Sequence, residues 1–141
     1  MKKYVINPGE KGIDALQVQE LTSRQLAPRE VCVRVHSASL NYRDLITVNM
    51  GVSQELIPLS DGAGVVEDVG EEVVHLKKGD RVVGLFFPLW QSGNIDACKF
   101  AVARGGVPTD GMLADCVYGL EDSFVKFPDY LTYEEASTLP C

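Results

Sequence analysis

Apolar and polar residues alternate along much of the chain with a period of two, the pattern that predicts β-strands with one buried face. The clearest example is REVCVRVHSASL, residues 29–40. Its two faces carry Val31, Val33 and Val35 on one side and Cys32, Arg34 and His36 on the other. Further strands are predicted in GAGVVEDVG (62–70), GDRVVGLF (79–86), GMLADCVYG (111–119) and SFVKFPD (123–129). Strands at such close spacing favour a barrel or a sandwich.

Helical patterns are sparse in comparison. NYRDLITVNM (41–50) predicts one helical turn after Asn41, and TYEEASTLPC (132–141) predicts a short helix. In the second segment Thr132 can cap the helix, Glu135 completes a capping box, and a proline near the end stops it. The stretch QSGNIDACKFAVARGGVPTDG, residues 91–111, is rich in small residues and is expected to form a long surface loop.

Composition and charge narrow the class of protein. The 141 residues suffice for one domain with a real core, but not for a large two-domain enzyme. The net charge is −7 and Lys and Arg do not cluster, so nucleic acid and anionic membranes are poor candidate partners. No apolar run reaches the roughly 18–20 residues of a membrane span, and the N-terminus lacks a secretory signal pattern. We therefore expect a cytoplasmic protein.

The four cysteines form no Cys-x-x-Cys pair, and so they predict neither a zinc knuckle nor a redox motif. We expect all four thiols to be reduced, as is usual for a cytosolic protein. Cys32 and His36 share a strand face, but four residues of strand separate them by ~13 Å. That distance is too long for both to bind one metal ion.

The segment PLSDGAGVVEDVG, residues 58–70, contains two glycines one residue apart. A dinucleotide-binding loop needs a third glycine and a following helix. Here the third position is Glu67, and the residues after the glycines have a strand pattern. We therefore expect the glycines to allow a backbone bend or a close approach between strands.

Five segments in the same order give the chain a family resemblance: SASLNYRDL, PLSDGAGVVEDVG, KKGDRVVGLF, GMLADCVYG and YEEASTLPC. Together they resemble the N-terminal, GroES-like catalytic domain of the medium-chain dehydrogenase/reductase superfamily over nearly the whole chain. The resemblance implies a mainly β fold, a GroES-like β-barrel with short helices, spanning residues 1–141. Members of the superfamily carry a Rossmann domain directly after this GroES-like domain. These 141 residues do not include it, so we expect the natural chain to continue past Cys141.

The resemblance also places the residues that hold catalytic zinc in the zinc-dependent alcohol dehydrogenases. Those positions correspond here to Asn41, Ser60 and Cys141, and only the last is a strong zinc ligand. The four-cysteine structural zinc lobe of those enzymes corresponds to FPLWQSGNIDACKF, which has the single cysteine Cys98. The chain therefore resembles the zinc-lacking, quinone-oxidoreductase-like branch, and FFPLWQSG looks like an NAD(P)-dependent alcohol dehydrogenase-like subgroup. We expect no metal.

Without zinc, hydrogen-bond donors must stabilise the oxygen that gains charge as hydride arrives. Asn41 and Tyr42 are suitable in type and are the candidate catalytic residues. The resemblance places both, together with Arg43 and Cys141, against the cofactor, where Arg43 would meet a phosphate. Two structural alternatives stay open: Asn41 as a helix cap and Arg43 in a surface salt bridge.

Substrate contacts are expected from Ser60, Phe87 and Trp90. Ser60 has the alternative of bonding the backbone at the bend. The run Phe86–Trp90 has the alternative of a strand end that enters the core, because substrate pockets and cores are both apolar. The Asp44 carboxylate is expected to orient its neighbours rather than to react.

The sequence thus favours the substrate-side domain of a zinc-independent oxidoreductase. The enzyme would transfer hydride between a nicotinamide cofactor and a small alcohol, carbonyl or quinone/enone. The cofactor, NAD or NADP, would be bound mainly by the absent domain. The chain alone would then be inactive, and the full-length enzyme a possible homo-oligomer. The alternative is a non-enzymatic GroES-like module for binding or assembly, for which the long polar loop offers no specific support.

Overall fold

A computed structural model describes all residues, 1–141. The strands are β1 (Lys2–Ile6), β2 (Leu16–Glu20), β3 (Glu30–Ser39), β4 (Asp61–Val69), β5 (Arg81–Gly84), β6 (Cys116–Leu120) and β7 (Phe124–Lys126). The helices are α1 (Tyr42–Met50), α2 (Ala97–Ala101) and α3 (Tyr133–Ser137), with 3₁₀ turns at Ile13–Ala15 and Glu121–Ser123. None of these helices has the length and apolar character that crossing a membrane requires.

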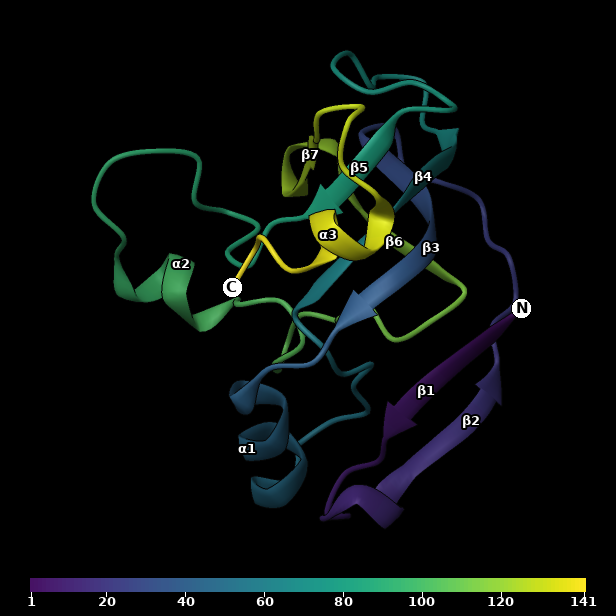
Figure 1. Cartoon of the computed structure of the whole chain (residues 1–141). Helices are drawn as coiled ribbons and strands as arrows, with labels where there is room; N and C mark the ends of the chain where they lie inside the picture. Colours follow the sequence, from purple (N-terminus) through teal and green to yellow (C-terminus); the bar gives the residue numbers. More distant parts are fainter.

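Five strands form one antiparallel sheet in the order β6-β3-β4-β5-β7, and β1 pairs with β2 in a separate ribbon. Figure 1 shows the larger sheet strongly curled, with α3 packed against it and α1 at the end of β3. The predicted mainly β, GroES-like fold with short helices is confirmed.

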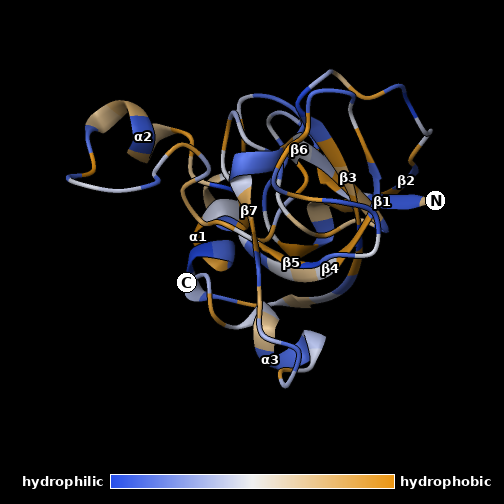
Figure 2. Ribbon diagram, turned by 90° about the horizontal axis from the view of Figure 1, so that it is seen from above, coloured by the Kyte–Doolittle hydropathy of each residue, from blue (hydrophilic) through white to orange (hydrophobic).

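The main core is an apolar cluster of buried side chains that come mostly from the strands of the larger sheet. Figure 2 shows hydrophobic residues along these strands. Val31 and Val33 are fully buried, and Val35 packs against the same cluster. This confirms the face predicted for the valines of β3. Smaller apolar clusters lie under α3 and between α1 and the β1–β2 ribbon.

The glycines of PLSDGAGVVEDVG sit where β4 approaches its neighbours too closely for a side chain. A Cβ on Gly64 would collide with the carbonyl group of Arg34 on β3, and one on Gly62 would lie 2.7 Å from Met112 Cβ. The predicted close strand approach is therefore confirmed, and β4 is a strand rather than the start of a phosphate loop.

Three local predictions were incomplete or wrong. The segment 91–111 is not wholly a loop, because the Asp96 carboxylate accepts from the Lys99 backbone N–H at 2.9 Å and starts α2. The helix after Asn41 has nine residues rather than one turn. The β1–β2 ribbon was not predicted, although LQVQE in β2 alternates apolar and polar residues and Val5 and Ile6 of β1 are fully buried.

The expectation that all four cysteines are reduced was also wrong. Cys32 and Cys116 form a disulfide between the adjacent strands β3 and β6, whereas Cys98 and Cys141 are free and exposed. The two bonded residues are 84 positions apart, and only the sheet topology brings them together.

Candidate functional site

The first turn of α1 is held by the backbone of Asn41 and the side chain of Asp44. The Asn41 N–H donates to Asp44 Oδ2 at 2.7 Å, and the Asp44 N–H donates to the Asn41 carbonyl at 3.0 Å. The predicted N-cap position of Asn41 is confirmed. Two atoms remain buried without a hydrogen-bond partner, namely Asn41 Nδ2 and Asp44 Oδ1. This half-satisfied pair marks the beginning of α1 as a polar site with unused hydrogen-bonding capacity.

The Asp61 carboxylate, at the start of β4, joins two other predicted site residues. Its Oδ1 accepts from the Ser60 hydroxyl at 2.6 Å, and its Oδ2 accepts from the Cys141 backbone N–H at 2.9 Å. Leu59, just before this pair, has a positive φ of 71°, an uncommon conformation for a residue with a side chain. The turn therefore delivers Ser60 and Asp61 into the interior, where both are fully buried.

Burial and charge set the protonation of this group. Burial raises the pKa of the Asp44 carboxyl, against the hydrogen bond from the Asn41 backbone. Desolvation raises the pKa of the Cys141 thiol, and the neighbouring Asp61 and Asp44 carboxylates raise it further.

Arg43 projects from α1 toward the segment that follows α2. Its Nη1 donates to the Arg104 carbonyl at 2.6 Å, and its guanidinium lies 4.9 Å from the centre of the Phe86 ring. Burial lowers the pKa of Arg43. No carboxylate forms a salt bridge with it, so the surface salt bridge considered from the sequence is wrong.

An apolar pocket of about 320 Å³ opens beside this polar group. It is lined by Leu85, Phe86, Phe87, Trp90, Pro140 and Cys141. The Phe87 ring packs edge-on against Phe86 at 4.6 Å and against Trp90 at 6.3 Å between centroids. Because β5 ends at Gly84, these aromatic residues lie outside the core, and the alternative of a strand end that enters the core is wrong.

The structure gathers some of the predicted site residues and separates others. Phe87, Trp90 and Cys141 share the apolar pocket. Ser60 is buried and donates to Asp61, so its hydroxyl already has a partner. The Tyr42 side chain is 78% exposed and lines none of the main pockets.

Sequence reasoning missed Asp61 as the residue that connects the site. Its side chain holds both Ser60 and the end of the chain, across 80 residues of sequence. The only available signal was its position directly after Ser60, because a contact with so distant a backbone N–H depends on the fold.

The fold and the cleft define a class: the GroES-like barrel domain of the medium-chain dehydrogenases/reductases. The sequence pattern of the alcohol dehydrogenase GroES-like domain family matches residues 27–129. The chain therefore belongs to this family, as the sequence resemblance predicted.

Individual relatives agree with this assignment. A zinc-type alcohol dehydrogenase-like protein of Schizosaccharomyces pombe is 37% identical over 99% of this chain and 41% of its own length. The solved structure of a provisionally assigned alcohol dehydrogenase from Sinorhizobium meliloti 1021 has 33% identity and a TM-score of 0.82, covering 100% of this chain and 44% of that one. A quinone oxidoreductase of Pseudomonas syringae pv. Tomato DC3000 has 25% identity and a TM-score of 0.69, covering 97% and 37%.

The chain spans about two fifths of the length of the curated relatives it matches. What those proteins do as wholes therefore enters here only as a basis for a proposal.

Proposed function

We propose that this chain is the substrate-side domain of an NAD(P)-dependent oxidoreductase that transfers hydride to or from a small alcohol, carbonyl or quinone/enone. The observation that carries the proposal is the apolar, aromatic pocket that meets Cys141, next to the buried polar group around Asp61. A small apolar substrate fits such a pocket, since ligand sites combine apolar walls with a few fixed polar groups. The relatives named as alcohol dehydrogenases and as a quinone oxidoreductase support this substrate range.

The residues at the positions of the catalytic zinc ligands do not fit zinc. The Ser60 hydroxyl is committed to Asp61, and Asn41 offers only a neutral amide. The remaining position, Cys141, is the only one of the three with a strong zinc ligand, whereas a catalytic zinc site uses three protein ligands. We infer that hydride transfer here does not use a catalytic zinc, although one relative carries the name zinc-type.

In place of zinc, the start of α1 supplies the electrostatic stabilisation. The substrate oxygen gains negative charge when it accepts hydride, and hydrogen-bond donors aimed at that oxygen stabilise the transition state. Asn41 Nδ2 has no partner in the domain, and the Tyr42 hydroxyl is exposed beside it in sequence. Asn41 and Tyr42 lie at the N-terminal, positive end of the α1 dipole, which also stabilises negative charge on the substrate oxygen.

The hydride itself comes from a bound nicotinamide, the chemistry that NAD or NADP supplies. This chain holds little of the cofactor, because it has no Gly-rich loop between a strand and a helix. We assign the main cofactor contacts to a dinucleotide-binding domain and secondary contacts to Asn41, Tyr42, Arg43 and Cys141. Arg43 uses only part of its five N–H donors on backbone carbonyls, so others remain for a phosphate. Ser60 serves the substrate indirectly by fixing Asp61.

The test is a hydride-transfer assay on the chain joined to a dinucleotide-binding domain, with NADH or NADPH and a panel of aldehydes, ketones and quinones. Phe87→Ala removes a wall of the pocket and should raise KM for apolar substrates. Phe127→Ala is the matched control, because this ring is buried in the cluster under α3, away from the pocket. Equal KM changes in both variants, or no hydride transfer to any member of the panel, would overturn the proposal.

A further inference from the structure

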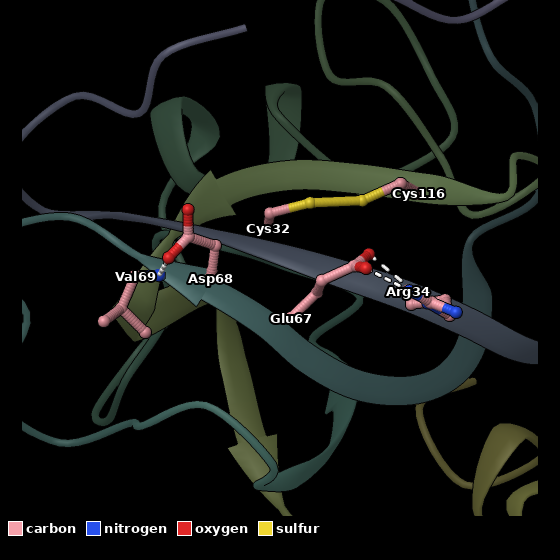
Figure 3. The surroundings of a disulfide bond; sticks show 6 residues. All are labelled: Cys32, Arg34, Glu67, Asp68, Val69 and Cys116. Carbon is pink, nitrogen blue, oxygen red and sulfur yellow. Dashed lines mark hydrogen bonds and ion pairs between the residues drawn. A yellow bond between two sulfur atoms is a disulfide. The ribbon is translucent and has the colours of Figure 1, made fainter. Parts of the chain in front are cut away.

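A second group of potential ligands lies outside the catalytic cleft, on the sheet itself. It consists of Cys32 on β3, Cys116 on β6 and Glu67 on β4. One ligand atom from each lies within 4.8 Å of the other two. In Figure 3 the Glu67 carboxylate lies below the Cys32–Cys116 disulfide and beside Arg34. None of the three residues lines the apolar pocket of the cleft.

A β-bulge places Glu67 in this group. Cys32 pairs with Asp68 and Val33 pairs with Val66, so the register shifts between these pairs and Glu67 is the extra residue on β4. A bulged residue escapes the strict alternation of a strand, and bulges re-aim side chains next to functional sites. The carboxylate of Glu67 therefore shares a face with the two sulfur atoms.

We propose that Cys32, Cys116 and Glu67 bind one zinc ion when the disulfide is reduced. Two thiolates and a carboxylate are established zinc ligands, and a water molecule completes the tetrahedron. The oxidised protein cannot bind the ion in this way, because the sulfur atoms are then bonded to each other. The site is thus controlled by the redox state of the cysteine pair.

Reduction of the Cys32–Cys116 disulfide requires a donor of two electrons, and a dithiol supplies them. The dithiol passes two electrons and two protons to the Cys32–Cys116 disulfide, which becomes two thiols, while the dithiol itself closes to a disulfide. Zinc then binds as Zn²⁺ with no change in oxidation state, and the two thiols release their protons to solvent. Oxidation of the pair by a disulfide of similar class reverses both steps and expels the ion.

The geometry suits a tetrahedral zinc site. With Zn–S bonds of about 2.3 Å and a Zn–O bond of about 2.0–2.2 Å, neighbouring ligand atoms lie about 3.4–3.8 Å apart. The present cluster already holds its three ligand atoms within 4.8 Å. The Cα atoms of the two cysteines are 6.6 Å apart, so side-chain rotation alone can separate the sulfur atoms after reduction.

The charges also suit a metal site. Arg34 forms an ion pair with the Glu67 carboxylate and so places a positive charge beside the three ligands. Zn²⁺ with two thiolates and one carboxylate carries a net charge of −1, and the Arg34 guanidinium neutralises it. The carboxylate has two oxygens, so it can keep Arg34 with one and bind the ion with the other.

Access to the site comes through a second pocket, of about 230 Å³, whose lining includes Cys116. Although both cysteine side chains are nearly buried, this opening gives a dithiol or a hydrated metal ion a route to the Cys116 sulfur.

The experiment is a titration of the 141-residue chain with Co²⁺ alone, in which the visible spectrum reports sulfur ligands. One sample is reduced with dithiothreitol and freed of reductant under anaerobic conditions, and the other is kept oxidised. We expect one Co²⁺ per reduced chain with thiolate-to-cobalt absorption, displacement by Zn²⁺, and no such absorption in the oxidised chain. Glu67→Gln should weaken Co²⁺ binding by at least about tenfold, while Cys32→Ser or Cys116→Ser should remove most of the absorption.

Cys98→Ser and Cys141→Ser are the matched controls, because these thiols are free and lie elsewhere. Both should bind Co²⁺ as the unchanged chain does. If the Cys32 and Cys116 variants do not fold, reduced Glu67→Gln and the oxidised unchanged chain decide the question, since both retain the two cysteines. Absorption that persists in the oxidised chain, that Glu67→Gln leaves unchanged, or that Cys141→Ser abolishes would overturn the proposal.

Discussion

Replacement of Asn41 by alanine separates a catalytic role of its side chain from a structural one. The hydrogen bonds of the Asn41 N–H and carbonyl at the start of α1 survive in Asn41→Ala, whereas the capping contact of its side chain with the Asp44 backbone is lost. Loss of an Asn at an N-cap costs about 1 kcal/mol of stability on average. The variant also removes the buried, unpartnered Nδ2, which relieves a desolvation penalty of roughly 1–3 kcal/mol. We therefore expect the free energy of unfolding to stay within about 1 kcal/mol or to rise.

The rate of hydride transfer should respond differently. A donor that meets the developing oxyanion stabilises the transition state more than the ground state. Loss of one such donor costs ~2.7–4 kcal/mol in other enzymes, about 10²–10³ in kcat. Because Asn41 is not among the residues that line the apolar pocket, we expect the lower end of this range.

Single-turnover hydride transfer and chemical denaturation on the same variant provide the assay, again with the dinucleotide-binding domain attached. Thr132→Ala is the control, since the Thr132 hydroxyl accepts from the Glu135 N–H at 3.1 Å and caps α3. It should lose about 1 kcal/mol of stability and keep its rate. If Asn41→Ala behaves like Thr132→Ala, with lower stability and an unchanged rate, the catalytic role of Asn41 is refuted.

Three further outcomes follow from the structure. Reduction of the Cys32–Cys116 disulfide in metal-free buffer should lower the free energy of unfolding by roughly 2–4 kcal/mol, because it releases a loop closed across 84 residues; equal urea midpoints for both redox forms would contradict this. The pKa that alkylation reports for Cys141 should lie above that of an ordinary thiol, because burial and the Asp61 charge raise it, and Asp61→Asn should lower it; an unchanged alkylation profile in the variant would contradict this. Gly64→Ala should lower the free energy of unfolding by about 1–3 kcal/mol or more, because the added Cβ would collide with the backbone of β3. Chemical denaturation is the measurement, and Gly79→Ala is the control. Gly79 has a positive φ and open space around it, so its variant reports backbone strain without a collision.

Much of the fold was predictable because it rests on local patterns. The alternation of β3 and the capping box of α3 both specify their elements within a few residues, and both are confirmed. The glycines of β4 were also interpretable, because a missing third glycine and a strand pattern exclude a phosphate loop. The β1–β2 ribbon was overlooked, although LQVQE in β2 alternates apolar and polar residues; its pairing with β1 in a separate ribbon depends on the fold.

The site was only partly predictable, because its contacts join distant parts of the chain. Phe87 and Trp90 were expected in a pocket from their apolar character, and they share one with Cys141. The link from Asp61 to the Cys141 backbone and the disulfide between β3 and β6 depend on strand order, which residue spacing does not specify. The bulge that turns Glu67 toward the sulfur atoms is likewise a property of the paired strands.

The central claim is hydride transfer without a catalytic zinc. The most direct measurement follows deuterium from NAD(P)H labelled at the transferred position into the product, in a single turnover of the domain-joined chain after exhaustive chelation in the oxidised state. We predict that the product gains the deuterium and that the rate is unchanged when Zn²⁺ is added back. The account would be contradicted if chelation stops the transfer, added Zn²⁺ restores it, and Cys141→Ser prevents this restoration.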